Sequence, residues 1–189
     1  MKIVIIGLSA TSTWGNGQGQ MYRNLVRELD TRGHEVLFLD RHDAPALDRA
    51  RRRAPLRKRD TYRSLSDLKR RFGRQVREAQ VVIVGSGVED AIEIGLWVTS
   101  IAKGVTVFYD VDTHYTLSKL ERGDAESVTR ALVPKYNLYL SFSNGRDLQE
   151  LERKFGSPMA RTLRDRSPAQ RAARLERYVV EAMTGRPMA

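Results

Sequence analysis

Five apolar runs rich in β-branched residues alternate along the chain with stretches that have the periodicity of amphipathic helices. The runs are continuously apolar, which is typical of strands buried on both faces of a sheet. Strands separated by helices predict a parallel sheet with right-handed crossovers. We therefore predict an α/β fold, a single doubly wound domain whose mostly parallel sheet of about five strands carries helices on both faces. The expected strands are residues 2–7, 35–40, 81–85, 105–110 and 137–142.

A helical pattern follows each of these runs. The first helix is expected over residues 18–32, with Met21, Leu25, Val26 and Leu29 on one face. The remaining helices are expected over residues 67–78 with Ser66 as N-cap, within residues 87–104, and over residues 116–122, 147–155 and 168–183, the last opened by Ser167 and Pro168.

Composition excludes several classes of site. The 189 residues suffice for one domain with a sizeable core, and the absence of cysteine excludes disulfides, thiolate metal sites and cysteine nucleophiles. The three histidines lack metal-ligand spacing, so no metal site is expected. No apolar run approaches the roughly 20 residues of a membrane span, and the opening run is too short for a signal-peptide core. We expect no membrane span and a cytoplasmic location.

The net charge of +10 raises the question of a polyanionic partner. Positive charge concentrates in residues 49–59 and recurs in residues 69–74. A solvated basic loop and a site for nucleic acid or another phosphate-rich partner both remain open. No aromatic residue interrupts residues 49–59, so stacking on exposed bases is not supported there.

The loop GLSATSTWGNGQGQ after the first strand resembles a dinucleotide-binding loop only superficially. Such a loop needs its first glycine at the strand end, whereas Gly15 comes eight positions after Gly7. Gln20 stands where a third spaced glycine belongs, and Asp40 is the only candidate for the acidic partner at the second strand. A Gly-Lys-Ser/Thr phosphate loop is also absent. Binding of NAD is therefore disfavoured.

The same loop lies at the carboxyl end of a strand, where open α/β sheets bind ligands. Its glycines would let the backbone approach a ligand closely, and Trp14 could stack on a sugar ring. A plain flexible turn is the alternative. The substrate-binding candidates in this loop are Trp14, Gly15, Asn16, Gly17 and Gln18.

Acidic residues follow the fourth strand at the same expected edge. Asp110, Asp112 and His114 are the catalytic candidates, since a carboxylate or an imidazole there could bind a hydroxyl group or act as general base. The alternative is that Asp112 caps the next helix through the amides of Thr113 and His114. Ser86, after the third strand, is a further ligand-binding candidate.

The residues after the third strand also include two acids. Glu89 and Asp90 are expected to charge the first turn of the following helix.

Several segments together resemble the CgeB-like glycosyltransferases, enzymes of the two-domain GT-B type. The resemblance covers roughly residues 1–160, in order and at the expected spacings. It is carried by GLSATSTWGNGQGQMYRNLVRELDTRGHEVLFLDR, YRSLSDLKRRF, VVIVGSGVEDAIEIGLWV, GVTVFYDVDTHYTLSKLERGD, PKYNLYLSFSNG and LERKFGSP.

The resemblance implies a division of the chain. Residues 1–160 would be the N-terminal, Rossmann-like, acceptor-side domain, and residues 161–189 would be the family's C-terminal helix packing back on it. The nucleotide-sugar domain between them is absent. No resident cofactor is expected on this chain, because the nucleotide-sugar donor belongs to that absent domain.

Two positions depart from the family pattern. Gln18 replaces a histidine after Gly-Asn-Gly, and a glutamine amide cannot take a proton from an acceptor hydroxyl. His114 replaces the proline of Asp-x-Asp-Thr-Pro.

The resemblance predicts an acceptor-side domain with little or no sugar transfer on its own. A sugar acceptor or a nucleotide-sugar would be its ligand, and a second copy or the missing domain in trans would complete the cleft. A basic module for nucleic acid and a stable scaffold without a ligand remain the alternatives.

Overall fold

The structure is a computed structural model that describes residues 1–7, 16–41, 58–164 and 167–185. It contains one sheet in which all seven strands are parallel to their neighbours. The strands are β1 (Lys2–Ile6), β2 (Glu35–Arg41), β3 (Arg59–Tyr62), β4 (Val81–Gly85), β5 (Val105–Asp110), β6 (Leu138–Ser141) and β7 (Ala160–Thr162). Their order across the sheet is β3-β2-β1-β4-β5-β6-β7.

Helices follow the strands as the sequence pattern predicts, except between β2 and β3, whose connection lies outside the described residues. The chain is a single Rossmann-like α/β domain. The helices are α1 (Asn16–Thr31), α3 (Leu65–Glu78), α4 (Ala91–Ile101), α5 (Thr113–Arg122), the short 3₁₀ turn η1 (Val133–Lys135), α6 (Arg146–Arg153) and α7 (Pro168–Thr184).

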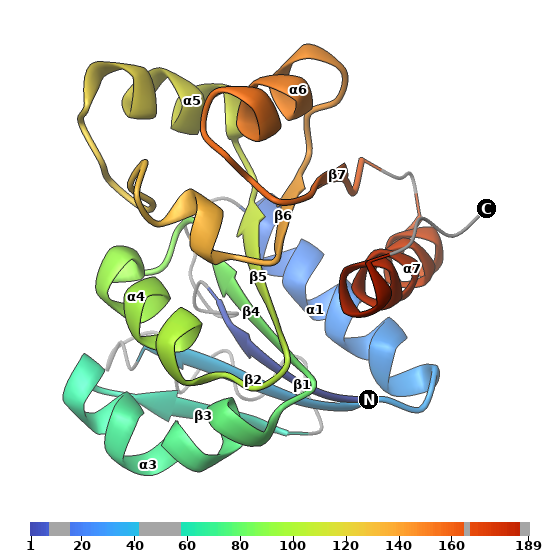
Figure 1. Ribbon diagram of the computed structural model, residues 1–189. Coiled ribbons are helices and arrows are strands. Elements are labelled where there is room, and N and C mark those ends of the chain that lie inside the picture. Colours follow the sequence, from blue (N-terminus) through green and yellow to red (C-terminus); the bar gives the residue numbers. More distant parts are fainter. Residues whose placement is uncertain (8–15, 42–57, 165–166, 186–189) are drawn as a thin grey trace.

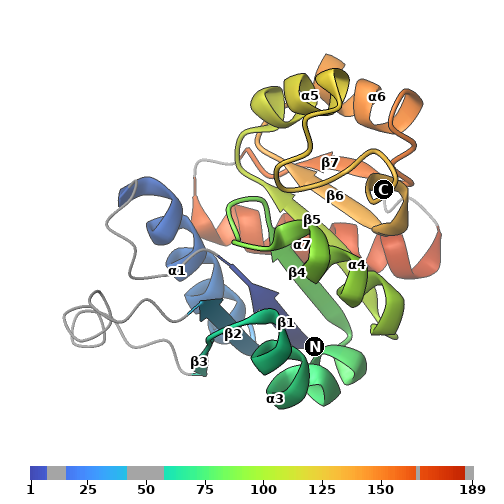
Figure 2. The same cartoon turned by 90° about the vertical axis from the view of Figure 1, so that its left-hand side faces the viewer.

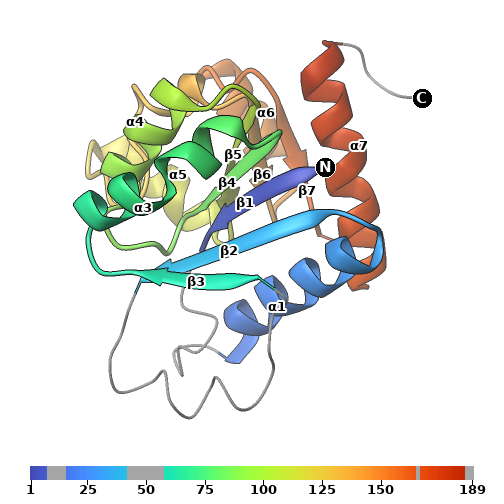
Figure 3. The ribbon, with the colours of Figure 1, turned by 90° about the horizontal axis from the view of Figure 1, so that it is seen from below.

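The sheet separates two hydrophobic cores. Successive strand residues point to opposite faces, so Val82 and Val84 of β4 join the core under α3 and α4, while Val81 and Ile83 join the core under α1 and α7. Figures 1 and 3 show α1 and α7 together on one side of the sheet and α3 and α4 on the other. Figure 2 shows α5 and α6 near β6 and β7. Both faces of the central strands are therefore covered.

All five predicted strands are present, and the sheet extends beyond them by the two edge strands β3 and β7. These strands are only four and three residues long, and their sequences RDTY and ART contain no apolar run. An edge strand pairs on one side only, so backbone pairing with β2 or β6 suffices to hold it. The strand β7 also spans the expected domain boundary at residue 160.

Helix starts differ from expectation at some positions. Ser64, and not Ser66, is the N-cap of α3, where its side chain accepts a hydrogen bond from the Asp67 amide at 3.2 Å. The predicted start of α7 is confirmed, since the Ser167 hydroxyl accepts from the Gln170 amide.

The C-terminal helix α7 packs against α1 through a charged cluster above shared apolar residues. Leu175 and Val179 of α7 belong to the same buried core as α1. Above them, Arg32 binds the Glu176 carboxylate through two hydrogen bonds of 2.7 Å, and His34 lies 2.6 Å from the same group. The Arg32 guanidinium lowers the pKa of Glu176 to about 2. The turn between α1 and β2 is thereby joined to α7.

Replacing Glu176 with glutamine should destabilise the fold at neutral pH by about 1–2 kcal/mol, because charge-assisted hydrogen bonds are lost. The folded-state pKa is depressed, so this contribution is present above the ordinary pKa of about 4.5 and is lost as the pH falls toward about 2. Urea unfolding of wild type and variant from pH 7 down to pH 2.5 should show the gap closing. Glu78→Gln, in an exposed pair with Arg74, is the control and should change little. A gap independent of pH would contradict the prediction.

Gly104, just before β5, is required by packing. A Cβ atom there would overlap the carbonyl oxygens of Ala79 and Gln80, which are backbone atoms and cannot rotate away.

Gly104→Ala should therefore destabilise the fold by about 1–3 kcal/mol, as expected for overpacking. Gly73 of α3 is a matched control, because the nearest atom to an added Cβ is 4.0 Å away. Gly73→Ala should stabilise by about 0.5–1 kcal/mol, since alanine is the better helix former. Thermal unfolding of both variants measures the contrast, and equal effects would show that the Gly104 backbone has room to move.

Candidate functional site

The carboxyl ends of the parallel strands lie along one edge of the sheet. At one point of this edge, the connections from neighbouring strands cross to opposite faces of the sheet. The crossover after β1 leads to α1 on one face, and the crossover after β4 leads to α4 on the other, although β1 and β4 are neighbours. Open α/β sheets bind their ligands at such a point. The candidate site is therefore the carboxyl edge around β1, β4 and β5.

A row of aromatic rings lies at this edge on the α1 face. The ring of Tyr22 lies 5.8 Å from that of Phe38 and 5.3 Å from that of Tyr109, which in turn lies 5.6 Å from Phe142. Tyr22, Phe38 and Tyr109 are buried. The row runs across the sheet on the face that α1 covers.

Glycines at the strand ends make room for these rings. A Cβ atom on Gly7 would lie 2.8 Å from the Phe38 ring, and one on Gly85 would overlap the Tyr22 hydroxyl. These two glycines thus serve aromatic packing.

Asp110, the first catalytic candidate, is buried, with an exposed fraction of 1 %. It accepts a hydrogen bond of 2.6 Å from the Tyr139 hydroxyl and one of 3.1 Å from the Asp112 amide. Burial raises the pKa of the Asp110 carboxyl, and these hydrogen bonds offset part of the rise. Its contacts hold the ends of β5 and β6 together, and solvent does not reach it.

The other two catalytic candidates, Asp112 and His114, are exposed. Asp112 is exposed and caps α5, where it accepts a hydrogen bond of 3.1 Å from the Tyr115 amide. The cap predicted as an alternative is present, but through Tyr115 and not through Thr113 or His114. His114 lines a groove between α5 and α6. The structure therefore does not gather the three candidates into one catalytic group.

The groove between α5 and α6 has a volume of about 590 Å³. Lys154 pairs there with both Glu121 and Glu150, so neighbouring charges largely balance. Its other lining residues are also of mixed charge and favour no particular ligand.

Ser86 lies at the edge as predicted. Its amide donates to the Tyr109 carbonyl at 3.0 Å, and its hydroxyl oxygen accepts from the Val111 amide at 3.3 Å. Ser86 is half-buried, so its hydroxyl hydrogen is available to a ligand.

The substrate-binding candidates of the opening loop divide at residue 16. Trp14 and Gly15 lie outside the described residues. Asn16, Gly17 and Gln18 form the first turn of α1, so their backbone is helical two residues earlier than predicted.

Charged groups near the end of β2 are paired. Asp40 is fully buried and binds Arg59 through hydrogen bonds of 2.5 and 3.1 Å, so the carboxylate considered for a nucleotide ribose is already engaged. Glu89 and Asp90 both contact Arg41, at 3.0 and 2.6 Å. Asp90 is the N-cap of α4, but its side chain makes no cap hydrogen bond.

The basic segments show mostly paired cations where the structure describes them. Of residues 49–59, only Lys58 and Arg59 are described, and both contact carboxylates. Arg70, Arg71 and Arg74 of the second segment are also paired.

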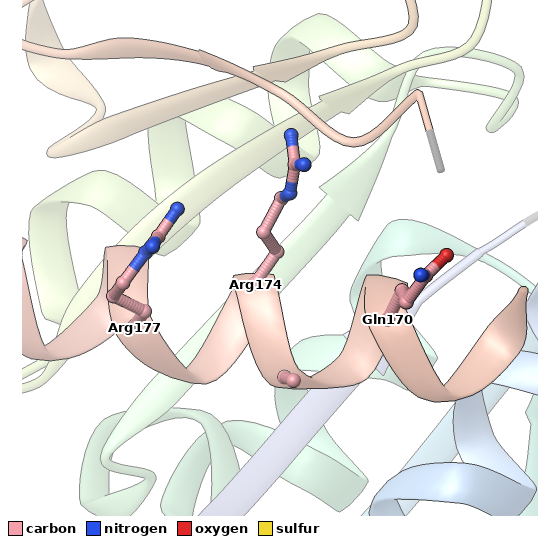
Figure 4. Close-up of a pocket in the computed structure, with 4 residues that line it drawn as sticks. Gln170, Arg174 and Arg177 are labelled. Carbon is pink, nitrogen blue, oxygen red and sulfur yellow. The ribbon is translucent and has the colours of Figure 1, made fainter. Parts of the chain in front are cut away.

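A second hollow, of about 400 Å³, lies along α7. Gln170, Arg174 and Arg177 line it, and Figure 4 shows their side chains projecting from the helix. Arg177 also lies over the ring of Tyr178, at 5.4 Å. None of the predicted site residues lines this hollow.

Two classes of feature are absent from the part of the chain that the structure describes. No three histidine or acidic side chains are grouped so that they could hold a metal ion. No described helix is both long and apolar enough to cross a membrane.

Comparison with known proteins does not assign the chain to a family. No protein-family model matches the chain, and no curated protein is significantly similar to it.

The sequence analysis missed three residues that shape the edge. Tyr22 is buried on the inner face of α1, where Met21 had been predicted and is only half-buried. Tyr139 and Arg59 hold the buried carboxylates of Asp110 and Asp40. The sequence around Tyr139 gives no signal that its hydroxyl binds Asp110 on the neighbouring strand.

Tyr139→Phe should destabilise the fold by about 1–3 kcal/mol, because it removes a hydrogen-bond donor from a buried carboxylate. Tyr136→Phe is the matched control. Both rings pack on Phe108, at 5.2 and 5.4 Å, but the Tyr136 hydroxyl has no hydrogen-bond partner. The control should unfold at the same urea concentration as wild type or higher. Equal loss in both variants would mean that the Asp110 contact contributes nothing.

Proposed function

We propose that this chain is the acceptor-binding half of a GT-B-type glycosyltransferase fold, and that its ligand lies at the carboxyl edge around β1 and β4. Such a half transfers sugar weakly or not at all by itself, because the contacts to the nucleotide-sugar come from the other half of the cleft. A second chain supplies that half of the cleft.

The observation that carries the proposal is the position of α7. A C-terminal helix that returns to cover the first domain is what the resemblance implies, and α7 packs against α1 and over β5 and β6. The proposed ligand position agrees with a general rule, because open α/β sheets bind ligands at a switch point such as that between β1 and β4.

The edge offers groups suited to a polyhydroxylated ligand. Ser86 can donate a hydrogen bond, and the exposed Asp112 can accept one from a ligand hydroxyl. Asp110 supports the strand ends and does not reach solvent. Lacking the nucleotide contacts that stabilise a departing phosphate, these groups account for binding better than for catalysis.

A polyanion-binding module is the weaker candidate. The described cations of the two basic segments are mostly paired with carboxylates, so these segments do not favour it.

Thermal unfolding with a panel of monosaccharides, sugar phosphates, nucleotide-sugars and NAD tests the proposal. A ligand at about 100 times its Kd adds about 2.7 kcal/mol, which is on the order of 5–10 °C for a chain of this size. We expect a shift with a sugar or sugar phosphate, and none with NAD.

Ser86→Ala should reduce that shift, whereas Ser118→Ala, in the groove between α5 and α6, should leave it unchanged. A shift with NAD, or a shift abolished by the Ser118 variant and not by the Ser86 variant, would refute the proposed site.

A further inference from the structure

The hollow along α7 brings two arginine side chains together. It has a volume of about 400 Å³ and is lined by Gln170, Ala173, Arg174 and Arg177. These residues recur at helical spacing, so they share one side of the helix, and Figure 4 shows the three long side chains projecting from that side. Gln170, Ala173 and Arg177 are exposed and Arg174 is half-buried. A ligand can therefore reach the hollow from solvent.

The carboxylates of α7 bind cations of other elements. The helix contains two glutamates, and its first turn contains no acidic residue. Glu176 binds Arg32 and His34, and Glu181 binds Arg161 at 2.7 Å. Positive charge therefore prevails on the side of α7 that carries the hollow.

Packing positions the Arg177 guanidinium at the hollow. It lies over the ring of Tyr178, at 5.4 Å, and that ring is buried in the core beneath α7. Stacking on an aromatic face leaves the N–H donors at the edge of a guanidinium available. Within the described residues, Arg177 pairs with no carboxylate. Its donors are therefore accessible to a ligand.

Two guanidinium groups one helical turn apart suit a phosphate group. Residues three apart on a helix have Cβ atoms about 5–6 Å apart, so Arg174 and Arg177 can reach one ligand. One guanidinium satisfies a carboxylate, whereas the additional charged oxygen of a phosphate can engage a second one. Arg174 has five N–H donors and can serve more than one partner. The Gln170 amide can bind a hydroxyl group of the same ligand.

The size of the hollow favours a small molecule over a nucleic acid. Its volume lies within the range of about 300–1,000 Å³ that is typical of small-molecule sites. A nucleic-acid interface usually buries about 1,000 Å² of protein surface or more and contacts several phosphates. Two arginines line the described part of this hollow.

We propose that the hollow along α7 binds a small molecule through a phosphate or diphosphate group, held by Arg174 and Arg177. This site is separate from the ligand position proposed at the carboxyl edge, and it does not depend on that function. Gln170 contacts the uncharged part of the ligand.

Isothermal titration calorimetry with inorganic phosphate, pyrophosphate and glucose 6-phosphate tests the inference. The titrations use about 0.1 M salt, where exposed charges more than about 10 Å apart are largely screened. Wild type should bind at least one of the three probes. Arg177→Gln should weaken that binding about tenfold or more, because charge-assisted hydrogen bonds are lost. Ser86→Ala, at the carboxyl edge, should leave it unchanged, which separates this site from the proposed acceptor site.

Two further variants distinguish a specific site from general attraction to a positively charged chain. Ala173→Glu places a carboxylate four positions before Arg177, where the two side chains pair along the helix. It should abolish binding although both arginines remain, and it should fold as wild type because Ala173 is exposed. Arg122→Gln removes one charge from the exposed end of α5, on the other face of the sheet, and should leave binding unchanged.

Several results would overturn the inference. They are the absence of binding to every phosphate probe in wild type, equal weakening by Arg177→Gln and Arg122→Gln, and binding that survives Ala173→Glu. A short DNA duplex provides a last arm. If the duplex binds more tightly than every small phosphate and Arg177→Gln abolishes that binding, the hollow belongs to a nucleic-acid surface and the small-molecule site is rejected.

Discussion

The parallel direction of all seven strands determines where this molecule can act. Because every carboxyl end lies at one edge, residues far apart in the sequence, such as Ser86 and Val111, meet there. The helices α1 and α4 lie on opposite faces of the sheet, so the neighbouring strands β1 and β4 form the switch point of the fold. Neither feature needs a special loop sequence. The fold itself therefore provides the candidate ligand position, and individual side chains would determine what binds there.

Aromatic packing limits how that position is built. Tyr22 and Phe38 lie over Gly85 and Gly7, and any side chain at either glycine would displace a ring. A glycine at a strand end is commonly associated with close approach of a ligand to the backbone. Here the glycines admit protein rings instead, while the half-buried Ser86 next to Gly85 keeps a hydroxyl that solvent can reach.

Much of the fold was predictable, because continuous apolar runs are unambiguous when both faces of a strand are buried. The strands β3 and β7 were not, since their polar residues are held by backbone pairing with a neighbour. At the site, the helix cap formed by Asp112 was predictable as an alternative, because it joins residues only three positions apart. The bond from Tyr139 to Asp110 spans 29 positions, and no local pattern indicates it. The ligand roles of the site residues stay predictions.

The helix α7 closes the core on one face of the sheet. It packs against α1, β5 and β6, and its buried residues share a core with Tyr22 and Tyr109. Without α7, the apolar residues of β5 and β6 beneath Leu175 would face water, and exposed apolar surface of that kind promotes association. The C-terminal helix therefore completes the core that contains Tyr22 and Tyr109, and the stability of this face of the sheet depends on it.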